Sequence, residues 1–182
     1  MPTHAAFLRA VNLGPTRKTS SADLRSAFEG EGLDEVSTFR TSGNVVFAAG
    51  RESSAKLTRR IEKALGKAFG FEVVVFLRSA KEVRAIAAER PFTPKQLDSS
   101  QGRLQVWLLH EKPAAAAQKN VLELATDADR LAFGKRELFW LPKAGTQTSE
   151  LDQKAIGKLV GPATMRTMGT IEHVAAKYFG EA

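Results

Sequence analysis

The order in which strand and helix signals follow one another is the feature of this sequence that most constrains its fold. Residues 4–11 are apolar on both faces of a strand except for Arg9, as expected of a central strand. Ser20 and Asp23 resemble a capping box, which indicates that a helix begins there. Further strand signals lie at 36–41, 45–48 and 73–77, and further helix signals at 57–68 and 79–90. This β-α-β-β-α-β order predicts a ferredoxin-like unit.

The same order begins again after a polar stretch that predicts a linker. A strand at 103–110, a helix at 114–125, a hairpin at 131–141 and helices at 149–160 and 170–179 follow, without a clear last strand. We therefore predict an α+β fold with a ferredoxin-like unit at 1–90, a linker at 91–101, and a second, degenerate ferredoxin-like repeat with C-terminal helices at 102–182.

A tight turn is predicted between two strand signals of the first half. The residues there are Ser42, Gly43 and Asn44. Short connections between twisted strands favour positive φ angles, which glycine and asparagine adopt at least cost. We expect a positive φ at Gly43 or Asn44.

Composition narrows the class of protein. Of 182 residues, 43% are apolar and 26% are charged, a balance typical of a folded soluble protein. The absence of cysteine excludes disulfides, thiolate metal ligands and thiol nucleophiles. The longest strongly apolar run, residues 73–77, is too short to cross a bilayer, and Arg9 interrupts the apolar N-terminal stretch, which argues against a signal peptide. We expect a cytoplasmic protein without a membrane partner.

The sequence does not carry the common catalytic motifs. Dinucleotide-binding, P-loop, zinc-protease and nucleophile-elbow signatures all fail to match. The three histidines, His4, His110 and His173, are far apart and are best interpreted as surface or boundary residues. The sequence therefore predicts no catalytic residue, metal site, cofactor or oligomeric state, and an uncharacterised enzyme stays an open alternative.

Basic residues outnumber acidic ones by 27 to 20, which gives a formal net charge of +7. Four of the basic residues recur at helical spacing along the second predicted helix: Lys56, Arg60, Lys63 and Lys67. The favoured interpretation is a solvated helix face whose long side chains cover the edge of the core. The alternative is a contact line for nucleic-acid phosphates, which would make the protein a nucleic-acid-binding module.

Arg9 is a cation inside an otherwise apolar strand. A buried charge is costly when it has no partner, so Arg9 needs a compensating group. The favoured interpretation is an ion pair with a carboxylate of the same domain, and the alternative is contact with a ligand. Asn12 and Gly14 follow the strand, and Lys18 lies in a basic loop before the first predicted helix. Loop cations beside a helix N-terminus suit a small anion.

Three segments of the chain resemble one bacterial family. Residues 7–14 read Phe-Leu-Arg-Ala-Val-Asn-Leu-Gly, close to a family pattern L-L-R-G-I-N-V-G, with Ala10 in place of glycine and Pro15 where a second glycine is usual. Residues 42–47 and 129–140 resemble two later blocks. The family is known as domain of unknown function 1697. The resemblance implies an α+β fold of ferredoxin-like repeats, and it implies no activity.

Near the C-terminus the family pattern T-x-R-N-W-N-T-V has a partial counterpart. Thr164, Arg166 and Thr170 match, whereas Thr167-Met168-Gly169 replaces the Asn-Trp-Asn centre. Arg166 and Thr170 are thus placed at the start of the last predicted helix, where free N–H groups and the helix dipole favour negative charge.

These observations lead to one hypothesis about a binding site, in which the protein binds a small anionic ligand. Because Arg9 and Arg166 both lie in segments that carry the resemblance, we expect them to share this ligand. The predicted site comprises Arg9, Asn12, Lys18 and Arg166, with Thr170 at a helix N-terminus nearby.

Overall fold

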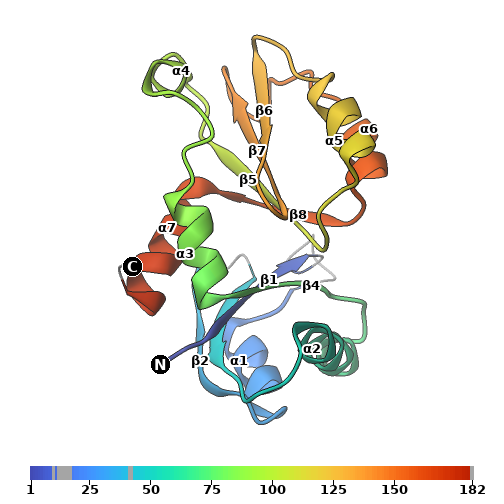
Figure 1. Ribbon diagram of the computed structural model, residues 1–182. Helices are drawn as coiled ribbons and strands as arrows, with labels where there is room; N and C mark the ends of the chain where they lie inside the picture. The colour runs from blue at the N-terminus through green and yellow to red at the C-terminus, as the bar shows by residue number, and fades with distance from the viewer. Residues whose placement is uncertain (10, 12–17, 41–42, 181–182) are drawn as a thin grey trace. The chain divides into compact units, whose positions relative to one another are not determined.

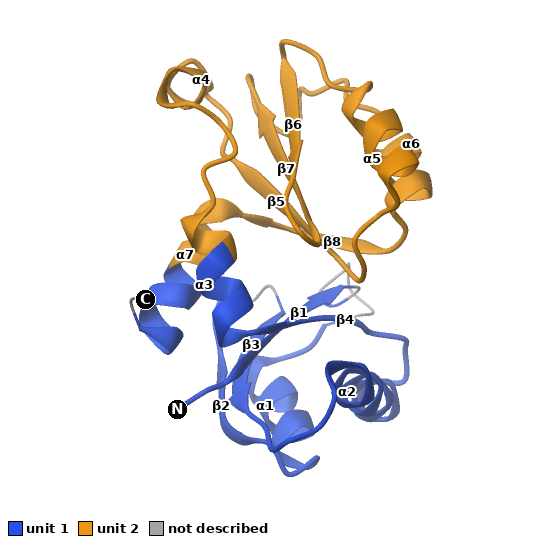
Figure 2. Ribbon diagram, viewed as in Figure 1, with its two compact units in different colours: residues 1–85, 173–182 blue, residues 86–172 orange. Residues whose placement is uncertain are grey.

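The computed structural model describes residues 1–9, 11, 18–40 and 43–180. Within these ranges the chain forms two four-stranded antiparallel sheets with helices packed against them, an α+β fold (Figure 1). The chain divides into two compact units. Unit 1 contains residues 1–85 and 173–182, and unit 2 contains residues 86–172 (Figure 2).

The sheet of unit 1 is built from β1 (His4–Arg9), β2 (Asp34–Thr38), β3 (Asn44–Ala48) and β4 (Val74–Ser79). The strands lie in the order β2-β3-β1-β4. β1 pairs with a strand on each side, and its residues 5–8 are all buried. The prediction that this apolar run is a central strand is confirmed.

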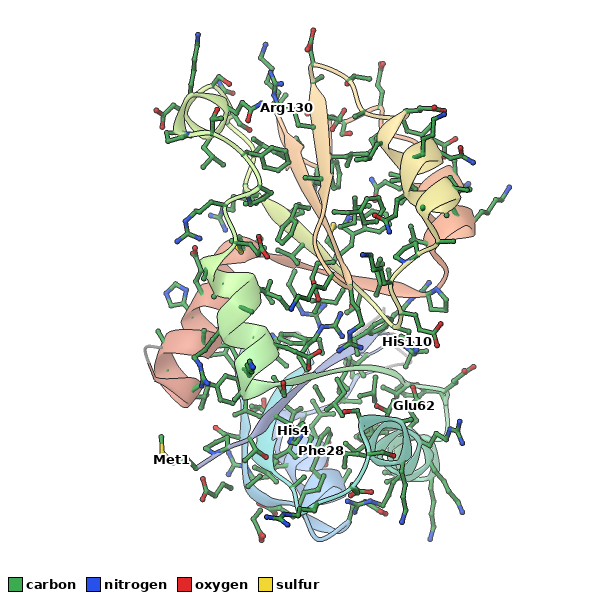
Figure 3. All side chains as sticks on the ribbon, in the orientation of Figure 1. Met1, His4, Phe28, Glu62, His110 and Arg130 are labelled. Atoms are coloured by element: carbon green, nitrogen blue, oxygen red, sulfur yellow. The ribbon has the colours of Figure 1, made fainter. Side chains whose placement is uncertain are left out.

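Two helices, α1 (Ser21–Glu29) and α2 (Ser54–Phe69), cover one face of this sheet (Figure 1). Their apolar side chains join those of the strands in one buried cluster. Phe28 of α1, labelled in Figure 3, illustrates the packing. Its ring centroid lies 5.3 Å from that of Phe47 in β3. Burial of these stripes against one sheet face is the main source of stability for such a unit.

Local capping confirms two of the predicted helix starts. At α1, the N–H of Asp23 donates to Ser20 Oγ at 3.0 Å, and the N–H of Ser20 donates to the Asp23 carboxylate at 3.2 Å. At α3 (Ala80–Ala88), Ser79 and Glu82 repeat this reciprocal arrangement at 3.3 and 2.8 Å. Each pair satisfies backbone donors that the helix itself leaves unpaired.

The sheet of unit 2 is built from β5 (Gln105–Leu109), β6 (Asp129–Phe133), β7 (Glu137–Pro142) and β8 (Ala163–Thr167), in the order β6-β7-β5-β8. Two helices, α5 (Ala115–Leu122) and α6 (Gln153–Val160), pack on one face. Trp107 and Trp140 project from the strands into the cluster under these helices. All of β5 is buried, as expected of a central strand.

The sequence shows no clear last strand in the second half, but the structure contains one. β8 pairs with β5 in an antiparallel ladder, and Arg166 lies opposite Val106. The strand escaped detection because its residues, Ala-Thr-Met-Arg-Thr, follow no apolar alternation and only Thr164 among them is buried. An edge strand of this kind is held by backbone pairing rather than by an apolar side-chain pattern.

The segment 91–101 contains a short helix, α4 (Pro94–Asp98). At the other end, α7 (Met168–Val174) is followed by a π-helical turn over Ala175–Phe179. Arg84 Nη1 donates to the Phe179 carbonyl at 3.1 Å, which fastens this turn within unit 1. The predicted boundaries at 90 and 102 stay a prediction; the compact units differ from them because residues 173–182 pack in unit 1.

Among the helices that the structure describes, none is long and apolar enough to cross a bilayer.

We predict that the turn at Gly43 makes a measurable contribution to stability. Gly43 has φ +69°, which confirms the expected positive φ, while Ser42 lies outside the described residues. A Cβ added at Gly43 would also lie 2.6 Å from Val11 Cγ2. Gly43→Ala should therefore lower the free energy of unfolding through both backbone strain and crowding.

The matched control is Gly32→Ala, because Gly32 has the same φ of +69° but open space around its Cβ position. Strain alone should cost about 1–2 kcal/mol at Gly32. Urea unfolding should show a clearly larger loss for Gly43→Ala. Equal losses in the two variants would contradict the crowding argument.

Candidate functional site

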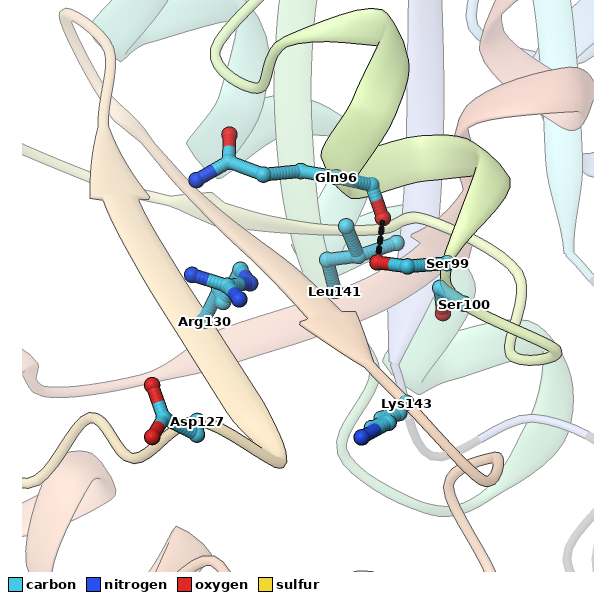
Figure 4. Close-up of a pocket in the computed structure, with 7 residues that line it drawn as sticks. All are labelled: Gln96, Ser99, Ser100, Asp127, Arg130, Leu141 and Lys143. Carbon is cyan, nitrogen blue, oxygen red and sulfur yellow. Dashed lines mark hydrogen bonds between the residues drawn. The ribbon is translucent and has the colours of Figure 1, made fainter.

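A polar pocket of about 310 Å³ lies within unit 2, between the α4 segment and strands β6 and β7 (Figure 4). Its volume is within the range of small-molecule sites. The residues that line it are Gln96, Ser99, Ser100, Asp127, Arg130, Leu141 and Lys143.

The strands place the two cations of this pocket. Arg130 lies in β6 directly opposite Leu141 of β7, so both side chains project from the same face of the sheet. Lys143 follows β7, and its backbone N–H donates to the Ala128 carbonyl at 2.7 Å. Neither Arg130 nor Lys143 forms an ion pair within the part of the chain that the structure describes.

Hydrogen bonds fix the α4 segment as the opposite wall. Thr93 and Gln96 cap α4 reciprocally, with the Thr93 N–H donating to Gln96 Oε1 at 2.8 Å. Ser100 Oγ donates to the Pro142 carbonyl at 2.8 Å, and the Gln101 N–H donates to the Lys143 carbonyl at 2.8 Å. The stretch predicted as a linker is thus attached to the end of β7.

A second pocket, of about 560 Å³, shares Gln96, Asp127 and Arg130 with the first. The two pockets are therefore neighbours that meet at Arg130. The further residues that line the second pocket are mostly apolar: Pro91, Phe92, Ala125, Thr126, Leu131 and Ala132. Together the two pockets form a groove in which Lys143 lies at one end, Arg130 lies in the middle, and Phe92 and Leu131 help to line the other end.

A third pocket of unit 2, of about 410 Å³, is built around the buried carboxylate of Asp129. Trp140 Nε1 donates to this carboxylate at 2.8 Å, and Ser149 Oγ donates to it at 2.7 Å. The bonds tie β6 and β7 to the loop before α6. We assign Asp129 a structural role, because a buried carboxylate is retained when hydrogen bonds satisfy it.

Part of the predicted anion site lies in unit 1. Arg9 is the last residue of β1, lies opposite Val74 and is exposed, so it is not the buried cation that its sequence context suggested. Water solvates its charge, and the argument that it needs a partner does not hold. Lys18 is exposed before α1, and Asn12 lies outside the described residues.

The other part lies in unit 2 and differs from the expectation. Arg166 lies in β8, donates to Thr164 Oγ1 at 2.9 Å and to the Met165 carbonyl at 2.8 Å, and burial lowers its pKa to about 10. It therefore stays protonated at neutral pH. Thr170 is buried inside the first turn of α7, and its N–H donates to Thr167 Oγ1 at 3.3 Å.

The free N–H groups expected at this helix are therefore engaged, since the Met168 N–H also donates to the Leu104 carbonyl at 2.8 Å. Gathering of Arg9, Asn12, Lys18, Arg166 and Thr170 around one anion stays a prediction.

The basic flank of α2 separates into two kinds of residue. Lys56, Lys63 and Lys67 are exposed and form no ion pair within the described ranges. Arg60 instead bonds the carbonyl of Glu31 and the carboxylate of Glu52. Arg60 is therefore part of the structure of unit 1, whereas the three lysines face solvent, and contact of this helix with nucleic-acid phosphates stays a prediction.

Sequence reasoning missed two kinds of charged residue. Arg78 in β4 is 1% exposed and donates to the Leu77 carbonyl at 3.0 Å, so the buried arginine of this sheet is Arg78 rather than Arg9. Arg78 directly follows the apolar run 73–77, much as Arg9 follows an apolar run, so the sequence did not distinguish the two. Arg130 and Lys143 gave no signal, since their pocket depends on a segment that is distant in sequence.

Histidine and acidic side chains do not gather into a metal site in the described ranges, where no group of three or more could hold a metal ion.

Comparison with known proteins agrees with the resemblance found in the sequence. The model of a family described as "Protein of unknown function (DUF1697)" matches residues 1–139. The chain belongs to the DUF1697 family. The match includes Arg130 of the pocket and ends before Lys143 and β8. Among curated proteins, none matches this DUF1697 chain.

A solved structure supports the fold of this family member. The chain is similar to the conserved bacterial protein SP0830 from Streptococcus pneumoniae, with a TM-score of 0.71 and 22% sequence identity. The alignment covers 97% of this chain and 98% of that chain. At this identity the likeness extends to the fold alone.

We predict that Gly102 is required for the wall of the pocket. A Cβ added there would lie 1.8 Å from the Pro142 carbonyl oxygen, so Gly102→Ala must displace the segment from the end of β7. Crowding of this kind costs about 1–3 kcal/mol. Hydrogen exchange should show faster exchange of the Gln101 amide, whose acceptor is the Lys143 carbonyl.

The matched control is Gly157→Ala in α6, where nothing lies within 4 Å of the added Cβ. Alanine is the better helix former, so this variant should gain up to about 1 kcal/mol. Unchanged exchange at Gln101 in Gly102→Ala would contradict the assigned wall.

Proposed function

We propose that this protein binds a small organic anion in the groove of unit 2, with Arg130 and Lys143 as its anchors. The observation that carries the proposal is that these two cations line one pocket, and neither has a carboxylate partner among the described residues. A guanidinium binds a carboxylate or phosphate through two parallel hydrogen bonds, and an ammonium adds a point charge.

The remaining polar groups limit what else the ligand contacts. Ser99 Oγ donates to the Gln96 carbonyl at 2.9 Å (Figure 4). Ser100 Oγ donates to the Pro142 carbonyl, so the single proton of each hydroxyl is already used. Gln96 Oε1 accepts the Thr93 N–H, which leaves its amide N–H₂ to donate. The donors for an anion are therefore Arg130, Lys143 and the Gln96 amide.

Charge and shape narrow the class of ligand further. Two cations and the carboxylate of Asp127 line the first pocket, so one positive charge is left to be balanced. A monoanion fits this balance better than a multiply charged group. Phe92 and Leu131 line the neighbouring pocket, which suits an apolar substituent. We propose a carboxylate that carries an aromatic or aliphatic group.

We also propose that the two units are copies of one ferredoxin-like arrangement. When the strands are counted from the start of each unit, both sheets have the order second-third-first-fourth. In both, two helices pack on one face. These features support the repeat that the sequence order predicts.

A second candidate function is the binding of nucleic-acid phosphates by α2. The observation that favours it is the row of exposed lysines, Lys56, Lys63 and Lys67, which lies on the helix face away from the buried Leu57, Ile61 and Leu65. Residues at this spacing follow one side of a helix, as phosphate contacts along a backbone require.

We predict that benzoate raises the melting temperature of the protein more than acetate does at equal concentration. Both supply a carboxylate, and only benzoate supplies an apolar group for the Phe92 end of the groove. A ligand at one hundred times its Kd stabilises the native state by about 2.7 kcal/mol. The double variant Arg130→Gln with Lys143→Gln should lose the shift.

The control is Lys135→Gln, which removes an exposed cation from the β6–β7 hairpin outside the groove and should keep the shift. Equal shifts in wild type and in the double variant would contradict the proposed anchors.

For the second candidate, we predict that binding of a DNA duplex weakens steeply with salt if α2 contacts phosphates. Each lost contact reduces the steepness of the plot of log K against log salt by about 0.9, so changing Lys56, Lys63 and Lys67 to Gln should flatten the plot. Changing Lys154 and Lys158 of α6 to Gln provides the control. Equal flattening in the control would reject α2 as the contact surface.

A further inference from the structure

Aromatic and cationic side chains gather on unit 1 where β2 ends and the C-terminal helix begins its π-helical turn. We call this group the aromatic platform: Phe39, Arg40, His173, Lys177 and Tyr178. Its residues all belong to unit 1, and none of them lies on α2 or entered the functions proposed above.

The rings of the platform hold one another in place. The Phe39 and His173 ring centroids are 6.3 Å apart with an interplanar angle of 21°, so the rings stack. The Tyr178 ring meets Phe39 edge-on, at 6.3 Å and 84°. Ser37 Oγ donates to Tyr178 Oη at 3.4 Å, which ties Tyr178 to β2. Phe39 is half-buried and His173 is exposed, so the stack reaches solvent.

Two cations lie over these rings. The Arg40 guanidinium carbon is 5.2 Å from the Phe39 centroid, and Lys177 Nζ is 5.9 Å from Phe39 and 5.0 Å from Tyr178. Both side chains are exposed, and neither forms an ion pair within the described ranges. The platform therefore combines π faces with positive charge that no described carboxylate neutralises.

The backbone adopts two uncommon conformations to build this group. Arg40 has φ +58°, a left-handed conformation that costs a non-glycine residue about 1–2 kcal/mol. Residues 175–179 form the π-helical turn that carries Lys177 and Tyr178. Such turns are rare in proteins overall, and those that occur are often found at functional sites. Strained backbone persists where the surroundings hold it, often at binding sites.

We propose that the aromatic platform binds a nucleotide unit, with the base stacked on the Phe39–His173 rings and the phosphate held between Arg40 and Lys177. Flat bases stack on aromatic side chains, and arginine and lysine bind the backbone phosphate. A free nucleotide and a nucleotide within a single strand share this chemistry. The combination distinguishes the platform from α2, which carries lysines but presents no aromatic ring on the same face.

The test is fluorescence anisotropy of a labelled ten-nucleotide single strand with the full chain, followed by competition with adenosine monophosphate. Base stacking contributes about 1–3 kcal/mol per base, so Phe39→Leu should weaken binding about 5- to 150-fold. Lys177→Gln should also weaken binding and flatten its salt dependence, whereas Lys177→Arg should keep both. Full competition by the monophosphate identifies a free nucleotide as a sufficient ligand, and binding of the strand without competition assigns the site to strands.

Changing the exposed Lys154 and Lys158 of α6 to Gln should leave this affinity within twofold, because neither residue belongs to the platform or to α2. Because Lys177 is exposed, its variants test the proposal even where Phe39→Leu lowers stability. Absence of binding by both probes at millimolar protein would overturn the proposal, and so would wild-type affinity in Lys177→Gln.

Discussion

The burial of one central strand on both faces is the constraint on which each unit depends. β1 and β5 each pair with a neighbour on either side, and the residues that they bury leave no face for solvent. A neighbouring edge strand can be polar where backbone pairing to the central strand holds it. β8 demonstrates this, since Thr164 is its only buried residue.

In each unit two helices cover one face of the sheet and complete the core, so other segments of the unit are not needed for that core. In unit 2, α5 and α6 complete the cluster around Trp107 and Trp140, while the α4 segment lies over the pocket that contains Arg130. In unit 1, α1 and α2 complete the core, and the C-terminal turn attaches beside β2 through Tyr178. The groove of unit 2 and the aromatic platform are therefore both built where an irregular segment meets the end or edge of a sheet, as is usual for function carried by loops.

The neighbouring residues in the sequence do not predict which of the arginines on the strands is buried. Arg9 and Arg78 each end an apolar run, and the sequence offers no rule for which of them is buried. The register decides: Arg78 lies opposite Ala5 within the sheet, whereas Arg9 lies opposite Val74 at the exposed end of β1. The same reasoning applies to Arg60, which the helical spacing grouped with the lysines and which carboxylates of unit 1 in fact hold.

The sequence by itself determined the features that depend on neighbouring residues: the order of the elements in the first half, its central strand, the caps at Ser20 and Ser79, and the positive φ at Gly43. The family could also be identified from the sequence, because its motifs are short runs of neighbouring residues. Only the tertiary structure decided the sites, because their members are far apart in the chain. Gln96 meets Arg130 through the attachment of 100–102 to the end of β7, and Tyr178 meets Ser37 across 141 positions. Such contacts form when pairing register and loop closure bring distant segments together, and neither periodicity nor composition encodes that distance.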